Sequence, residues 1–224
     1  MVELCARLHE RPRVLVSGSA IGWYGVRGDE VLTEADTAGT GFAARLCAAW
    51  EAEAARASNL GVRVVRLRTG LVLGREGGML ARLLPPFDLG LGGPVGSGRQ
   101  IMSWIAHDDL VRLIVFAIAN DALEGPVNAT APVPVRNAEF AATLGAALHR
   151  LAFIPLPALP LHLVLGEMAD ELLLGGQRVL PAAALAAGFT FRHATLAEAL
   201  QAEVGGRGAV AVDLTGARLR PARS

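Results

Sequence analysis

The sequence predicts an α/β protein built on a parallel sheet, and three consecutive segments support this prediction. Val14–Val16 is a short apolar run that ends in small residues, which is typical of a buried parallel strand that leads into a loop. Residues 42–54 then repeat apolar side chains at helical spacing, and Gly61 ends that helix. Residues 62–67 form the next apolar strand. A strand, a helix and a strand at this spacing indicate a parallel crossover unit.

The remaining helices are predicted from their amphipathic pattern and from the residues that end or cap a helix. Residues 2–10 have the pattern of an amphipathic helix that Pro12 ends. In the helix over 42–54, the pattern places Trp50 on the apolar side and Glu51 on the polar side. We expect further helices from His107, where Asp108 and Asp109 cap free amides, from Asn137 to near His149, and from Thr195 to Val204, where Glu198 completes a capping box.

Composition excludes several classes of protein. The chain has 224 residues, 52% of them hydrophobic, and its 21 acidic and 21 basic residues cancel, so no basic surface for nucleic acid is expected. The longest apolar run, 113–119, is too short for a membrane span. Two cysteines are too few for a disulfide framework, which favours a cytoplasmic protein. The acidic residues after His107 lack a second ligand cluster, so we expect no metal site.

Six stretches, taken in order, resemble one family. They are residues 14–25, 46–51, 66–74, 83–87, 89–100 and 174–181. Together they resemble the atypical short-chain dehydrogenase/reductase family described as sugar-nucleotide epimerase-like, whose members end in a short domain of unknown function. The resemblance runs from about residue 1 to residue 204 and implies three parts: a partial Rossmann domain at 1–150, a small, mostly helical C-terminal domain at 151–204, and a flexible tail at 205–224.

The resemblance also implies that the doubly wound parallel sheet is incomplete, with only its C-terminal strands present. In such proteins the first strand leads into a glycine-rich loop that receives the cofactor pyrophosphate. The chain opens at a helix that normally follows that half. Gly90, Gly93 and Gly96 have the numerical spacing of the loop, but no strand precedes them and no helix follows, so we interpret them as a surface loop. The strand at 14–16 would then be an exposed apolar edge, and we expect poor stability, aggregation or a homodimer through that edge.

The family's usual acid/base chemistry is absent from this chain. The wider superfamily uses a Tyr-x-x-x-Lys pair, in which the lysine lowers the tyrosine pKa. This sequence contains no lysine, and an alignment on Glu51 places Ala43 at the tyrosine position and Cys47 at the lysine position. Ser19, which fits the superfamily serine, and Tyr24, the only tyrosine, are therefore the remaining catalytic candidates, although either could be a turn or packing residue.

The resemblance implies further contacts with cofactor and substrate. Ser17 and the turn at Thr69, Gly70, Leu71 and Val72 are the expected contacts to NADP or NAD, where Gly70 permits a close backbone approach. Arg99 and Gln177 are the expected substrate contacts, Arg99 through a phosphate or carboxylate. Related epimerases carry an arginine where this chain has Met102, which weakens the case for a diphosphate sugar.

The function implied is an NAD(P)-dependent epimerase/dehydratase-like oxidoreductase that acts on a small molecule such as a nucleotide sugar. In this truncated form the chain is expected to be impaired or inactive. The alternative is a non-catalytic protein that senses a dinucleotide or serves as a scaffold, and the missing acid/base residues favour it.

Overall fold

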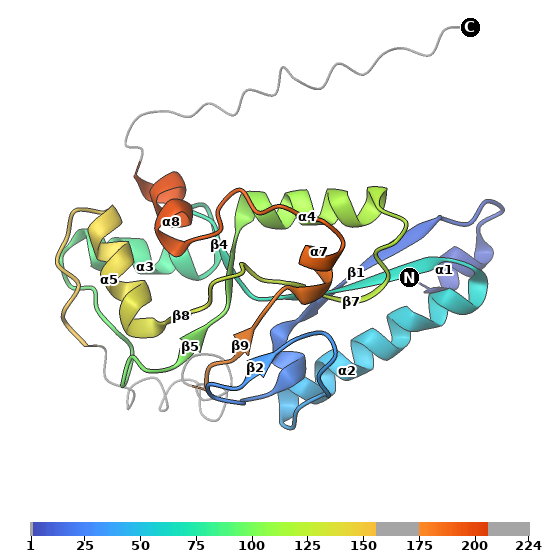
Figure 1. Ribbon diagram of the computed structural model, residues 1–224, viewed down its shortest axis with the longest axis horizontal. Coiled ribbons are helices and arrows are strands. Elements are labelled where there is room, and N and C mark those ends of the chain that lie inside the picture. The colour runs from blue at the N-terminus through green and yellow to red at the C-terminus, as the bar shows by residue number, and fades with distance from the viewer. Residues whose placement is uncertain (1, 156–174, 206–224) are drawn as a thin grey trace, which may run out of the picture.

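A three-stranded parallel sheet forms the centre of the computed structural model, which describes residues 2–155 and 175–205. Its strands are β1 (Val14–Ala20), β3 (Arg63–Thr69) and β7 (Gly125–Ala129), in the order β1-β3-β7, so β1 lies at an edge. Helices α2 (Phe42–Ala55) and α4 (His107–Ala119) lie on opposite faces of this sheet (Figure 1). The α/β class predicted from the sequence is confirmed.

Alternating side chains of β3 fill the two layers between sheet and helices. Val65 and Leu67 pack in a core with Leu113 of α4. Val64, on the other face, packs with Ala54 of α2. A strand buried on both faces explains why Val64, Val65 and Leu67 are all buried although they point to different sides of the sheet.

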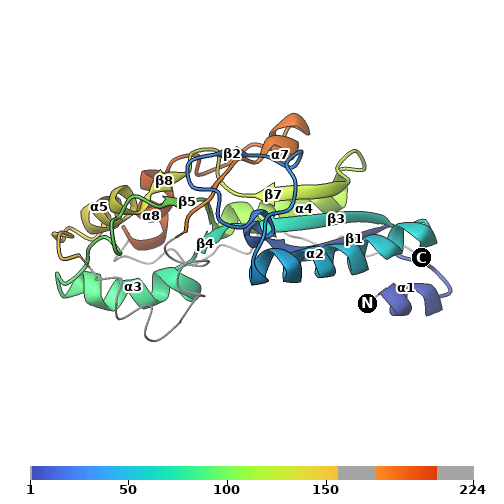
Figure 2. The ribbon, with the colours of Figure 1, turned by 90° about the horizontal axis from the view of Figure 1, so that it is seen from below.

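A second body of helices and short strands extends the molecule beyond the end of this sheet (Figure 2). After Gly70 the chain of β3 continues as β4, which pairs in parallel with β6, while β5 and β8 pair antiparallel. Three helices share one hydrophobic core here, in which Phe87, Phe140 and Leu200 are buried. These elements are β4 (Leu71–Leu73), α3 (Gly78–Asp88), β5 (Ile101–Met102), β6 (Trp104–Ala106), β8 (Val135–Arg136), α5 (Asn137–Ala147) and α8 (Leu196–Val204).

The described C-terminal segment returns across the carboxyl end of the sheet. Its strand β9 (Arg178–Val179) pairs in parallel with β2 (Val31–Leu32), and α7 (Ala182–Ala186) packs against β7. The remaining short elements are α1 (Val2–Arg7), η1 (Ile21–Tyr24) and η2 (Arg56–Leu60). Residues far apart in the sequence therefore meet where β1, β3 and β7 end.

The structure confirms one cap and corrects another. Thr195 and Glu198 form the predicted capping box at the start of α8. At the start of α4 no side chain forms an N-terminal cap. Asp109 is instead fully buried, and its carboxylate accepts hydrogen bonds from the backbone N–H groups of Arg192 and His193, both at 2.8 Å. Asp109 thus ties the C-terminal segment to α4. Of the tail expected at 205–224, all but residue 205 lies outside the described residues.

The predicted buried face of α2 is wrong. Trp50, placed on the apolar side, is 52% exposed, whereas Glu51, placed on the polar side, is only 3% exposed. Small residues, Ala44 and Cys47 among them, face the sheet instead. The reason is a polar site beneath the helix, which needs the Glu51 carboxylate.

Candidate functional site

A buried ion pair forms the centre of a polar cluster at the carboxyl end of the sheet. Glu51 on α2 and Arg68 near the end of β3 pair through two bonds, Nε to Oε1 at 2.8 Å and an Nη to Oε2 at 2.9 Å. Ser19, opposite Arg68 in the β1–β3 register, donates its hydroxyl to Glu51 Oε1 at 2.8 Å. Both charged side chains are almost fully buried. The two-point geometry gives the pair a fixed orientation.

Tyr24, at the end of η1, adds its hydroxyl to this cluster. Arg68 donates to that hydroxyl at 3.0 Å, and the hydroxyl in turn lies 2.7 Å from Asn128 Oδ1 and 2.9 Å from the Thr33 carbonyl. Since a phenol carries one proton, it donates to one of these two acceptors at a time. Trp23 stacks on the Arg68 guanidinium, 3.4 Å from its carbon to the ring centre. The hydroxyl is therefore enclosed and its hydrogen-bonding capacity is used.

Burial governs the protonation of this cluster. Loss of solvent raises the pKa of Tyr24 above its ordinary value of 10.0, although Arg68 beside it acts in the opposite direction. Burial by itself would lower the pKa of Arg68, but the hydrogen bonds to Glu51 and Tyr24 outweigh it and raise that pKa. At neutral pH Tyr24 is therefore a neutral phenol, and the Arg68 guanidinium beside it is charged.

The predicted cofactor turn lies beside the cluster, at the end of β3. Thr69 pairs with Ala20 and with Ala129, and it and the next three residues, Gly70 to Val72, are half-buried. A Cβ on Gly70 would lie 2.5 Å from the Ser103 carbonyl oxygen. The close approach at Gly70 is thus to the protein's own backbone, where the chain passes from β3 to β4.

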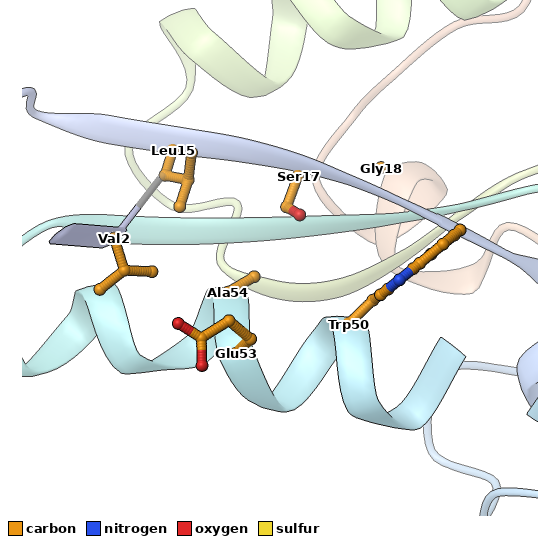
Figure 3. A pocket seen from close by; sticks show the side chains of 7 residues that line it. All are labelled: Val2, Leu15, Ser17, Gly18, Trp50, Glu53 and Ala54. Atoms are coloured by element: carbon orange, nitrogen blue, oxygen red, sulfur yellow. The ribbon is translucent and has the colours of Figure 1, made fainter. Parts of the chain in front are cut away.

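Ser17 lies apart from that turn. It pairs with Arg66, three register positions before the Ala20–Thr69 pair. It lines a hollow of about 310 Å³ between β1 and α2, together with Trp50 (Figure 3). The structure therefore does not bring Ser17 together with Thr69.

The two predicted substrate residues also occupy different places. Gln177 is buried and donates its amide to the Gly25 carbonyl at 2.9 Å, which fixes the C-terminal segment to the loop after η1. Arg99 lies exposed before β5, and its carbonyl accepts a bond from Arg136. Arg136 pairs with Asp29 at 2.8 Å. Arg99 thus belongs to an exposed charged group, and Gln177 to the packed interior.

Three members of the cluster were missed as site residues. Glu51 was assigned to the polar face of its helix, and Arg68 and Asn128 were not singled out. A signal existed in the first two cases. Glu51 lies four residues after the buried Cys47, and Arg68 alternates with apolar residues in a strand, where a charge needs a buried partner. No pattern in the sequence indicates that Asn128 reaches Tyr24.

Within residues 2–155 and 175–205, no group of three or more potential ligands could hold a metal ion. No helix in that part of the chain is long and apolar enough to cross a membrane.

The carboxyl ends of parallel strands, with polar side chains gathered above them, are where α/β proteins bind ligands. A family model described as "NAD dependent epimerase/dehydratase family" matches residues 1–129, and a domain of unknown function, DUF1731, matches residues 156–203. The chain belongs to the NAD-dependent epimerase/dehydratase family. It has the DUF1731 segment at the C-terminal end, as the resemblance implied.

Relatives and solved structures agree with this assignment. Epimerase family protein MT2273 of Mycobacterium tuberculosis is 51% identical over 186 residues, which are 83% of this chain and 62% of that protein. The human epimerase family protein SDR39U1, solved with NADPH, is 36% identical at a TM-score of 0.85, covering 91% of this chain and 69% of the other. A nucleoside-diphosphate sugar epimerase from Corynebacterium glutamicum is 38% identical at a TM-score of 0.75, over 91% and 40%. The chain thus spans about three-fifths of the length of the mycobacterial relative.

Proposed function

We propose that this chain supplies the nicotinamide side and the substrate side of an NAD(P)-dependent epimerase-family site, with NADPH as the cofactor. The observation that supports this proposal most directly is the polar cluster at the ends of β1, β3 and β7, next to the half-buried turn at 69–72. The similarity to a structure solved with NADPH agrees with the choice of cofactor.

The described residues fit one end of such a dinucleotide. Thr69 and Gly70 offer backbone at the sheet end, and Leu71 and Val72 offer apolar surface for a flat ring. In the described residues, none of β1, β3 and β7 leads through a glycine-rich loop directly into an α-helix of the kind that receives a pyrophosphate. The glycine-rich turn at residues 74–78 leads from the short strand β4 into α3. When bound, the nicotinamide would supply hydride transfer. Arg68 and Glu51 would hold the surrounding elements in place.

We propose a nucleotide sugar as the substrate class, held through its anionic group. Arg99 and Arg136 lie together beside Asp29, and Arg178 has a buried Nε without a hydrogen-bond partner in the described structure. Arginine binds phosphate oxygens through paired donors. Gln177 would act by fixing the C-terminal segment over the site.

Saturation-transfer difference NMR with NADPH tests which end of the cofactor the chain contacts. We expect the nicotinamide protons to receive more saturation than the adenine protons, because the described residues offer a site for that end alone. Thr69→Ala should weaken the nicotinamide signal. Thr143→Ala should leave it unchanged, because Thr143 is a half-buried threonine on α5 whose hydroxyl donates to the Glu139 carbonyl of its own helix. An adenine signal stronger than the nicotinamide signal, or equal loss in both variants, would contradict the proposal.

One observation favours a non-catalytic role in place of turnover. The Tyr24 side chain is fully buried and its hydroxyl is already engaged, and Ser19 donates to Glu51, so neither hydroxyl faces an open site. The catalytic roles of Ser19 and Tyr24 stay predictions, and a positioning role fits their contacts. Binding of NADPH without turnover of nucleotide sugars would support a dinucleotide sensor, and turnover would exclude it.

A further inference from the structure

Three arginines from separate segments lie near the Asp29 carboxylate. Arg136, on β8, donates to Asp29 Oδ2 at 2.8 Å, and its other Nη donates to the Arg99 carbonyl. Val31, the second residue after Asp29, pairs with Arg178 in the register of β2 and β9. These contacts bring the loops before β2 and β5 together with β8 and β9 (Figure 1).

Close backbone packing holds these segments together. A Cβ on Gly176, just before Arg178, would lie 2.6 Å from the Ile101 nitrogen, so the chain entering β9 lies directly against the start of β5. Ile101 is also the residue that pairs with Arg136 on β8, and Arg99 lies just before it. The three arginines are therefore held on backbone segments that contact one another.

The charges of this group are unequal. The hydrogen bond from Arg136 lowers the pKa of Asp29 below its ordinary value of 3.8, and the positive charges of Arg178 and Arg99 act in the same direction. Among these four side chains the positive charge exceeds the negative charge by two, three guanidinium groups against one carboxylate. The group therefore favours a ligand with more than one negative charge.

Arg178 has a donor that Asp29 does not use. Its Nε is buried and has no hydrogen-bond partner in the described part of the chain. A buried donor without a partner is uncommon, because the group has lost water and gained nothing in exchange. Among the described residues, Asp29 forms its ion pair with Arg136 alone. An acceptor that reaches both arginines at once would satisfy donors that the Asp29 carboxylate leaves open.

The loop that carries Asp29 is anchored independently of Arg136. Arg27 donates to Glu30 at 3.3 Å and to the Thr37 carbonyl at 3.1 Å. The Asp29 side chain itself is 62% exposed. An exposed ion pair contributes little to stability, so Asp29 can leave Arg136 at small cost while the loop stays in place.

We propose that the Asp29 carboxylate occupies, in the free protein, the position that the diphosphate of a nucleotide sugar takes when it binds, and that this diphosphate displaces Asp29 from Arg136. The inference rests on the proposed nucleotide-sugar site and adds a residue that controls its affinity. A diphosphate diester carries two negative charges and accepts paired bonds from arginine. A single sugar carboxylate would only exchange one negative charge for another, so the site favours a diphosphate.

Isothermal titration calorimetry with UDP-glucose, without NADPH, tests this inference. Asp29→Asn should bind UDP-glucose about fivefold more tightly than the wild type, because the carboxylate no longer competes for Arg136. Asp29→Glu keeps the charge and should bind as the wild type does. Asp121→Asn is the control for net charge, since Asp121 is also an exposed partner of arginines, Arg13 and Arg63, and it should leave the affinity unchanged.

Two arginine variants separate the role of Asp29 from the site itself. Arg178→Gln should weaken binding about tenfold, and Arg99→Gln, on an exposed loop, should act in the same direction. If these variants weaken binding while Asp29→Asn binds no more tightly than the wild type, the substrate site stands and the inference about Asp29 is wrong. An equal gain in Asp29→Asn and Asp121→Asn would also overturn it, because net charge would then be the cause.

Two further results bear on the ligand. Inorganic pyrophosphate carries the charge without base or sugar, and we expect it to bind more weakly than UDP-glucose, with the same order of affinities among the variants. Pyrophosphate binding as tight as that of UDP-glucose would overturn the nucleotide sugar as the ligand. Absence of binding to the wild type and to every variant would overturn both the substrate site and the role of Asp29, whereas the NADPH experiment would still report on the cofactor.

Discussion

Arg68 and Glu51 show how one buried pair can organise the end of a sheet. Their side chains are 3% and 4% exposed, and they connect β3, α2, β1 and η1 through Ser19 and Tyr24. Such a pair stabilises a fold only while both partners remain, because removing one leaves a charge in a poorly solvated place. The effect of this ion pair on the free energy of unfolding is therefore measured mainly by substituting one partner and leaving the other in place.

Arg68→Met should lower the free energy of unfolding by about 3 kcal/mol, since Glu51 would remain buried with only Ser19 and the more distant Arg66, at 3.7 Å, beside it. Denaturant-induced unfolding measures the change. Arg56→Met removes the same kind of pair from the surface of α2, where Arg56 and Glu53 are 65% and 57% exposed, and it should change stability little. If the two substitutions lowered the free energy of unfolding equally, the buried pair would contribute no more to stability than an exposed one.

Tyr24 makes the stability of the folded protein depend on pH in the alkaline range. Burial raises its pKa in the folded state above 10.0, so between these two pKa values the unfolded chain releases a proton that the folded protein keeps. The stabilisation is complete below pH 10.0 and is lost as pH rises through the folded pKa. Because Tyr24 is the only tyrosine, the ultraviolet absorbance of phenolate reports this one titration, and we expect it above the ordinary value. In Tyr24→Phe the steep alkaline loss of stability should become shallower; an unchanged slope would contradict this account.

Gly70, between two strand segments, acts at the scale of the secondary-structure element. It lets β3 continue into β4 while the chain crosses the Ser103 carbonyl, and Ser103 in turn bonds through its hydroxyl to the β9 strand. A methyl group there would lie 2.5 Å from that oxygen and 2.8 Å from a Thr130 methyl carbon. The turn that is proposed to contact the cofactor is therefore set by packing.

Gly70→Ala should destabilise the protein by about 1–3 kcal/mol, as overpacking does, and should also shift the resonances of the 69–72 turn. Thermal unfolding and NMR measure both effects. Gly18→Ala is the matched strand glycine, where the added carbon meets no atom within 4 Å, so its stability should be close to that of the wild type. Similar losses in both would show that the cost comes from the strand backbone and not from Ser103.

The whole molecule is held together by contacts between the sheet and the returning C-terminal segment. Residues 188–205 contribute to both main cores: Phe189 packs with α4 and β7, and Leu200 packs with α5. Asp109 adds charged hydrogen bonds to the two backbone N–H groups of Arg192 and His193. Residues 188–205, part of which DUF1731 matches, are thus packed against the family domain. The predicted domain boundary at residue 150 stays a prediction.

Asp109→Asn should release this attachment, because an amide nitrogen would face one of the two backbone donors. We expect faster proteolysis around residues 188–195, measured by mass spectrometry of limited digests. Asp121→Asn is the control, since Asp121 is 71% exposed and pairs with the exposed Arg13 and, at 3.5 Å, with Arg63, away from the C-terminal segment. If both variants were cleaved at the same rate as the wild type, Asp109 would not be needed to hold the segment.

The sequence by itself determined the α/β class, the strands at 14–16 and 62–67 with the helix between them, the helices that begin near His107, Asn137 and Thr195, the capping box at Thr195 and the family. These follow from periodicity, from local hydrogen-bonding preferences and from motifs in order, all of which lie within short stretches of chain. The sequence also indicated that β1 would be an exposed edge. Only the tertiary structure decided which face of α2 is buried, that Asp109 holds the C-terminal segment, and that Gly70 approaches Ser103. The same is true of the cluster of Ser19, Tyr24, Glu51, Arg68 and Asn128. Each of these depends on a partner between 17 and 104 residues away, and a buried charge or amide takes its position from that partner and not from its neighbours in sequence.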